Sequence, residues 1–160
     1  MTEQPTLAPL AQLVGSWSTE AMHPAVPGVV VRGTATFEWV EGERFLTYRV
    51  RTDHPDFPDA LCVMGHMEHD RAEGEHGQAA APTSGLRMHY FDSRGVFRIY
   101  EMRMADGAWQ IWRDAPGFSQ RFTGIFTDGG DTIEGRWELC RDDIHWDDDL
   151  AITFRRHKEP

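Results

Sequence analysis

The segment Thr132-Ile133-Glu134-Gly135-Arg136-Trp137-Glu138-Leu139 alternates between polar residues and a mostly apolar set. In an extended chain, this alternation places Ile133, Gly135, Trp137 and Leu139 on one face and the charged residues on the other. A period of two with aromatic and β-branched residues is typical of a half-buried β-strand. Residues 16–21 and 34–39 alternate in the same way. The pattern therefore predicts an all-β chain.

Ten segments of this kind follow one another along the sequence. They lie near 15–22, 29–40, 44–51, 60–69, 86–92, 96–104, 108–114, 118–127, 131–140 and 144–156. Turns such as 93–95 and 106–107 are too short to hold crossover helices, so consecutive strands are expected to pair as antiparallel hairpins. We predict an up-and-down antiparallel barrel of about ten strands, because closure removes both exposed edges. A β-sandwich is the alternative, although it usually has fewer strands and longer connections.

Only the N-terminal region has a helical pattern. Leu7, Leu10, Leu13 and Val14 share one face of a short helix predicted within 5–14, with Thr6 as its N-cap. Residues 53–59 form a stiff, acidic connection, and about 70–85 form an insertion expected to be flexible. Neither separates two cores, so residues 1–160 are expected to form one domain.

Composition narrows the possible partners. The chain has 16 basic and 26 acidic residues and a formal charge of −10, which disfavours nucleic acid and anionic membranes. No basic leader or long apolar run occurs near the start, so we expect a cytoplasmic protein. Cys62 and Cys140 are then expected to be buried free thiols. A homodimer through one barrel wall is possible.

Several short motifs resemble the calycin superfamily, which includes lipocalins and fatty-acid-binding proteins. They are Leu13-Val14-Gly15-Ser16-Trp17, residues 33–39, Thr123-Gly124 and Gly135-Arg136-Trp137-Glu138. Together they look like the nitrobindin-like barrels and a related bacterial calycin-like family. In lipocalins the Gly-x-Trp tryptophan crosses the closed end of the barrel under an arginine from the last strand. The resemblance implies that Arg155 or Arg156 stacks on Trp17.

The resemblance to nitrobindins also raises haem as a cofactor. Those proteins bind haem through a histidine near the start of the last strand. This sequence has Asp147-Asp148-Asp149 there, with His145 slightly upstream. A carboxylate is a poor substitute for a neutral imidazole on haem iron. Haem is therefore the minor alternative, and no cofactor is expected.

Alternation predicts which side chains line the interior. In the last strand Trp146, Asp148, Leu150, Ile152 and Phe154 share a mostly apolar face, which should point inward. Beside them lie Ile133, Gly135, Trp137 and Leu139, and then Phe118, Gln120, Phe122, Gly124 and Phe126. Apolar walls with a few polar groups suit a small-molecule site. The alternative is that these aromatic side chains simply fill the core.

The faces of the two middle strands cannot be assigned from the pattern, because 96–104 and 108–114 mix large apolar and charged residues on both faces. An arginine and a carboxylate turned inward would form an anchor for an anionic or carbonyl-bearing ligand, since an isolated buried charge is costly. An ion pair on the outer wall is the alternative. His145, Asp147 and Asp149 share a face that suits a hard cation, but this face should be outside and solvated.

The leading functional hypothesis is a carrier or sensor that binds a small apolar or amphipathic ligand inside the barrel. A cavity enzyme, an isomerase or hydrolase, is the alternative and would pair His66 or His89 with Glu101 or Asp148. No familiar catalytic motif occurs, so no catalytic residue is assigned. The candidate ligand-binding residues are Trp39, Tyr48, Met64, His66, His89, Tyr100, Glu101, Trp112, Arg113, Phe122, Trp137 and Asp148.

Overall fold

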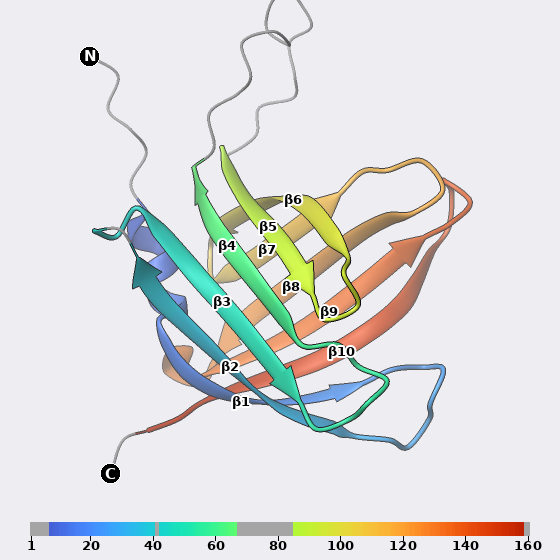
Figure 1. Ribbon diagram of the computed structural model, residues 1–160, viewed down its shortest axis with the longest axis horizontal. Helices are drawn as coiled ribbons and strands as arrows, with labels where there is room; N and C mark the ends of the chain where they lie inside the picture. Colours follow the sequence, from blue (N-terminus) through green and yellow to red (C-terminus); the bar gives the residue numbers. More distant parts are fainter. Residues whose placement is uncertain (1–6, 41, 67–84, 159–160) are drawn as a thin grey trace, which may run out of the picture.

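The computed structural model describes residues 7–40, 42–66 and 85–158, and shows a closed antiparallel barrel (Figure 1). A short 3₁₀ helix, η1 (Ala8–Leu13), precedes the first strand. The strands are β1 (Gly15–Met22), β2 (Val31–Val40), β3 (Phe45–Thr52), β4 (Ala60–His66), β5 (Leu86–Asp92), β6 (Phe97–Ala105), β7 (Ala108–Arg113), β8 (Ser119–Thr127), β9 (Thr132–Cys140) and β10 (Trp146–Arg156). A second 3₁₀ turn, η2 (Asp128–Gly130), joins β8 to β9.

Each strand pairs with its neighbours in sequence, and β1 also pairs with β10 to close the barrel. The tight β6–β7 turn explains why these neighbours meet as a hairpin. Asp106 and Gly107 have φ angles of 54° and 73°. Two successive positive φ values match a type I′ turn, whose twist fits that of the flanking strands. The predicted ten-stranded up-and-down barrel is confirmed.

One end of the barrel is closed by η1 and Trp17. Leu10 and Leu13 from the helix are fully buried, as is the Trp17 side chain. The indole Nε1 donates a hydrogen bond to the Leu13 carbonyl at 2.9 Å, which ties the helix to the first strand. Phe154 of β10 packs edge-on against the same indole. Apolar side chains therefore fill this end.

An arginine from the last strand covers Trp17, and it is Arg156. Its guanidinium carbon lies 4.1 Å from the Trp17 ring centroid. The same group donates to the carbonyl oxygens of Gln12 and Val14 and forms an ion pair with Asp131 at 3.2 Å. Arg155, the other candidate, is exposed on the outer wall near Glu20.

The structure changes the predicted helix. The segment is a 3₁₀ helix that begins at Ala8, and Thr6 lies outside the described residues. Its three-residue period aligns Leu7, Leu10 and Leu13 on the face that packs into the barrel. The predicted apolar face is therefore present, although the helix type differs.

The predicted face of the last strand is wrong in its first half, because β10 contains a bulge. Asp148 lies opposite Glu138, whereas Ala151 lies opposite Arg136, so β10 has one extra residue relative to β9. Such an insertion reverses the alternation of side chains. Ile152 and Phe154 point inward as predicted, but Asp148 is exposed and Trp146 stacks under Arg121 of β8 outside the barrel.

The structure shows which face of β6 points into the barrel. Tyr100 and Met102 of β6 are buried in the interior, whereas Phe97 and Ile99 are exposed on the outer wall. Glu101 also lies on the outer wall, where its carboxylate is 3.3 Å from Arg87 of β5. The inward arginine–carboxylate pair considered from the sequence is therefore not formed by Glu101.

Some sequence predictions concern other parts of the chain. Cys62 and Cys140 are both free and buried, as predicted. The expected flexible insertion at about 70–85 lies almost wholly outside the described residues, and so does the end of the predicted strand at 60–69. Within the described ranges, no helix combines the length and apolar character that a bilayer crossing requires.

The closed end provides a test of stability. Replacing Arg156 by alanine removes several charge-assisted hydrogen bonds and a cation–π contact. We expect the free energy of unfolding to fall by about 2–4 kcal/mol in chemical denaturation. Arg155→Ala is the matched control, and it should cost less than about 1 kcal/mol because its ion pair is exposed. Equal losses for the two variants would contradict this role of Arg156.

Candidate functional site

A cavity of about 520 Å³ occupies the half of the barrel opposite the closed end. It extends to the loops after β1, β3, β5, β7 and β9, which contribute His23, Phe57, Arg94, Phe118 and Arg141 to its lining. These loops lie together at the end of the barrel away from η1 (Figure 1). The volume is in the range of small-molecule sites.

Aromatic side chains make up much of the inner wall. The Trp109 ring lies between those of Tyr48 and Phe122, at centroid distances of 5.8 and 5.0 Å. Phe122 also contacts Trp137 at 5.1 Å. All four rings line the cavity, so a bound molecule would meet a continuous aromatic surface.

Two glycines set the position of Phe122. A Cβ atom on Gly135 would lie 2.6 Å from the Phe122 ring, and one on Gly124 would lie 3.0 Å from it. The absence of side chains at both positions lets the ring lie close to the backbone of β8 and β9. Any larger residue would displace Phe122, so Gly135 in the alternating motif helps to shape the cavity wall.

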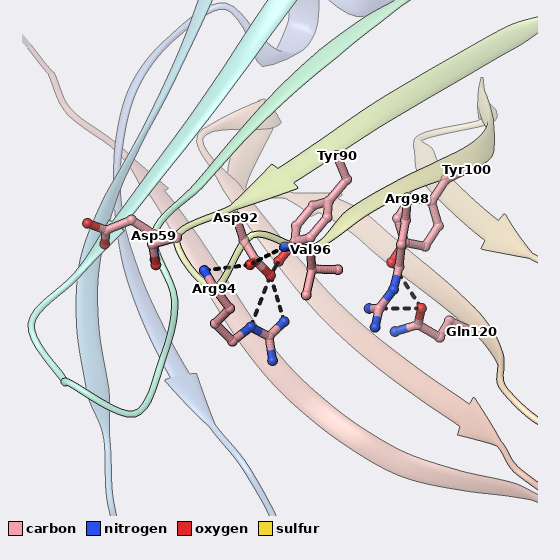
Figure 2. A network of polar contacts seen from close by, with 9 residues as sticks. Asp59, Tyr90, Asp92, Arg94, Val96, Arg98, Tyr100 and Gln120 are labelled. Atoms are coloured by element: carbon pink, nitrogen blue, oxygen red, sulfur yellow. Dashed lines mark hydrogen bonds and ion pairs between the residues drawn. The ribbon is translucent and has the colours of Figure 1, made fainter.

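A polar cluster interrupts the aromatic wall near the cavity mouth (Figure 2). The hydroxyl of Tyr100 donates to Oε1 of Gln120 at 3.0 Å, and Arg98 approaches the same oxygen at 3.5 Å. The Arg98 guanidinium also stacks over the Phe118 ring. Burial raises the pKa of Tyr100, and the nearby Arg98 offsets only part of that effect. Tyr100 therefore remains a neutral hydrogen-bond donor at physiological pH.

A second network, centred on Asp92, shapes the β5–β6 hairpin (Figure 2). The buried carboxylate accepts hydrogen bonds from the Tyr90 hydroxyl at 2.7 Å, from Arg94 and from the Val96 amide. Burial alone would raise the pKa of Asp92, but the hydrogen bonds from Arg94 and Tyr90 outweigh it and lower the pKa. The network fixes Arg94 at the cavity mouth with its charge compensated.

A histidine–carboxylate pair also lines the cavity. His23 Nε2 lies 2.6 Å from Asp149 Oδ1, and His23 Nδ1 accepts a hydrogen bond from the Ala25 amide at 3.0 Å. Because Nδ1 is the acceptor, Nε2 carries the proton that is donated to Asp149. Both ring nitrogens therefore already have hydrogen-bond partners within the protein.

The structure brings four of the predicted ligand-binding residues into the cavity lining. They are Tyr48, Tyr100, Phe122 and Trp137. Met64 is fully buried in the core, and Trp39 packs against that core near the closed end. His66 ends β4 at the same closed end, opposite Leu86. These three residues lie outside the cavity lining.

The remaining predicted residues lie elsewhere on the barrel. His89 stacks edge-on against Phe97 on the outer wall, where Glu101 and Trp112 are also found. Each neighbours an inward residue in its strand, so the two-residue period places it outside. Asp148 is exposed because of the bulge. Arg113 ends β7 and donates to the Phe118 carbonyl at 3.3 Å, outside the cavity lining.

The proposed cation-binding face is not formed. His145 Nδ1 lies 2.6 Å from Asp142, whereas Asp149 faces the cavity and bonds to His23. Asp147 lies opposite the cavity-lining Leu139 and Asp149 lies within the bulge, so these two carboxylates do not form the expected outer face with His145. Among the residues that the structure describes, no group of three or more histidine, cysteine or acidic side chains could hold a metal ion.

Several lining residues were not among the sequence candidates. Arg98 is two residues before Tyr100 and shares its face, so the spacing would have identified it once the inward face of β6 was known. Gln120 was predicted to face the interior, as it does, but was not among the candidate ligand-binding residues. His23, Arg94 and Arg141 come from loops, where no periodic signal exists. Asp149 lies within the bulge and was predicted to face outward.

Comparison with known proteins supports the fold. No protein-family model matches the chain, and neither does any curated protein. The crystal structure of Rv2717c from M. tuberculosis is similar, with a TM-score of 0.62, 14% identity and coverage of 98% of this chain and 100% of that one. The S-type phycobiliprotein lyase CPES from Guillardia theta matches with a TM-score of 0.52, 11% identity and coverage of 94% and 92%. These likenesses support the barrel fold.

The Asp92 network predicts a pH-dependent contribution to stability. A carboxyl group whose pKa is lowered in the folded state stabilises the fold above its unfolded pKa, about 3.9, and less as pH falls below it. We expect Asp92→Asn to cost about 1–3 kcal/mol at pH 7, measured by urea denaturation. The difference from the unmodified protein should shrink as the pH is lowered from about 5 towards 2.

Asp114→Asn is the control for this measurement. Asp114 is exposed, and the described part of the chain shows no hydrogen bond or ion pair for its side chain. Its substitution should change stability by less than about 0.5 kcal/mol at either pH. A difference for Asp92→Asn that stayed constant from pH 7 to pH 3 would exclude the proposed charge effect.

Proposed function

We propose that this protein binds a small apolar or amphipathic molecule inside the barrel, as a carrier or sensor. The observation that carries the proposal is the aromatic cavity of about 520 Å³ with a polar cluster near its mouth. Contact between an apolar wall and an apolar ligand stabilises the complex, roughly in proportion to the apolar area removed from water. The barrel folds of the two similar structures are compatible with such a role.

A cavity enzyme is the second candidate, and the His23–Asp149 pair is the observation in its favour. An imidazole that acts as a general base needs one nitrogen free to take a proton from the substrate. Here the Ala25 amide occupies Nδ1, and Nε2 donates to Asp149. Catalysis would therefore require this loop to rearrange, whereas ligand binding requires no change.

Haem is a poor fit to the side chains of the cavity. His23 is the histidine among the lining residues, and both of its nitrogens are engaged. Burial raises the pKa of the Cys62 thiol, so the thiolate that could bind iron is disfavoured. Burial likewise raises the pKa of Tyr48, with smaller contributions from Cys62 and Tyr90. These side chains do not favour a haem-dependent function.

Ligand binding can be tested by blocking the cavity. Val50 of β3 lines the cavity, whereas Arg49 beside it points to solvent. The unmodified protein should increase the fluorescence of the uncharged probe N-phenyl-1-naphthylamine saturably. Val50→Trp should weaken this binding at least about tenfold, because the larger side chain takes up space that the probe needs. Arg49→Trp should bind the probe normally.

Circular dichroism and thermal melts would show that both variants remain folded. A saturable signal that Val50→Trp leaves unchanged would mean that the probe binds outside the cavity. No saturable signal in the unmodified protein would contradict the proposed function.

The haem alternative can be tested by absorption spectroscopy. Because the lining histidine is engaged at both nitrogens, we expect hemin to give no sharp Soret band typical of a histidine-ligated haem. A sharp band that disappears in the His23→Ala variant would reverse this conclusion.

A further inference from the structure

The polar cluster at the cavity mouth contains more hydrogen-bond donors than acceptors. A guanidinium group only donates, so the oxygen of the Gln120 amide is the atom that faces Arg98. The same oxygen accepts from the Tyr100 hydroxyl. Its acceptor capacity is thus used within the protein, and the Gln120 Nε2 group is left as a donor.

The structure shows no acceptor for the remaining donors among the described residues. Gln120 Nε2 has no protein partner there, and Arg98 bonds only to the oxygens of Gln120 and Tyr100, which leaves most of its five N–H groups unpaired. Trp109 and Tyr48 add further donors along the wall. In the part of the chain that the structure describes, Trp109 Nε1 is buried without a partner and the Tyr48 hydroxyl makes no hydrogen bond. Unpaired donors in a buried site favour a ligand that brings acceptors.

Arg98 differs from the other charged groups around the mouth. Arg113 lies opposite Gln120 in the β7–β8 pairing, but it is bonded to the Phe118 carbonyl. Arg94 is compensated by Asp92, and Asp149 is paired with His23. Asp56 and Arg141 also line the cavity, and both come from its loops. Arg98 instead projects from β6 beside the buried Tyr100 and Gln120, and the described residues place no carboxylate within ion-pair distance of it.

We propose that the ligand carries a carboxylate, which Arg98 and Gln120 bind while its apolar body lies against Trp109, Phe122 and Trp137. This inference rests on the proposed function and names the chemical class of its ligand. A carboxylate has two acceptor oxygens and a negative charge, so it complements both the guanidinium and the amide donors. An uncharged carbonyl compound would satisfy the amide but leave the charge of Arg98 uncompensated.

The test compares two displacers of bound N-phenyl-1-naphthylamine that differ in one group. Decanoate and 1-decanol both have ten carbons in an unbranched chain, but only decanoate is charged at pH 8. We expect decanoate to displace the probe from the unmodified protein at a concentration at least about tenfold lower. In Arg98→Met this preference should disappear, through weaker binding of decanoate, while 1-decanol binds within about threefold of its original affinity.

Two further variants test whether Arg98 binds the carboxylate directly or whether positive charge at the mouth only attracts anions. Arg141→Met removes the same charge from the mouth but leaves the cluster intact, so the preference for decanoate should remain. Arg98→Lys keeps the charge and loses the planar guanidinium, so it should retain part of the preference. It also provides a folded comparison if the methionine variant is unstable.

Three outcomes would overturn the inference while probe binding persists. They are equal displacement by decanoate and 1-decanol in the unmodified protein, equal weakening of both in Arg98→Met, and complete loss of the preference in Arg141→Met. The first would indicate an uncharged ligand. Failure of the probe to bind the unmodified protein would instead overturn the proposed function, together with the inference.

Discussion

The seam between β1 and β10 is the constraint on which the rest of the barrel depends. Trp17 and Arg156 lie opposite each other in this pairing, so the contact that closes the sheet also seals one end of the interior. Arg156 reaches carbonyl groups just before β1 and an aspartate just before β9, which links three parts of the chain. With one end filled by Trp17 and η1, the open space is confined to the other half of the barrel. The loops there supply the charged side chains of the mouth.

A single extra residue in β10 determines the chemistry of one side of that mouth. The bulge between Asp148 and Ala151 leaves Ile152 and Phe154 inside but turns Trp146 outward, where it packs under Arg121. It also brings Asp149 to the cavity, within 2.6 Å of His23. Without the extra residue, regular alternation would have placed Asp148 in the interior. The bulge thus replaces an uncompensated buried carboxylate by a paired one, which is far less costly.

The sequence predicts the scaffold better than the site for a physical reason. Strands and turns depend on local alternation and glycine positions, so the ten strands and their order were accessible. The Trp17–arginine contact was implied instead by the resemblance to lipocalins, which left Arg155 and Arg156 as alternatives. The middle strands were ambiguous because their outer face is itself apolar: Phe97 is 54% exposed and Ile99 is 43% exposed. With apolar residues on both faces, periodicity could not show that Tyr100 and Arg98 point inward. The bulge and the loop residues His23, Arg94 and Arg141 leave no periodic trace at all.

The order of polar and apolar groups along the cavity favours one direction of entry. Arg98 and Gln120 are the second residues of β6 and β8, which both begin at the open end. Phe122 and Trp109 lie further along, towards the closed end. A charged group held near the mouth keeps part of its hydration, whereas the same group deeper inside would lose nearly all of it. An amphipathic ligand would therefore insert its apolar part first, and its polar group would meet Arg98 last. Because Tyr100 and Arg98 already hold the Gln120 amide, little side-chain ordering would remain to oppose that final contact.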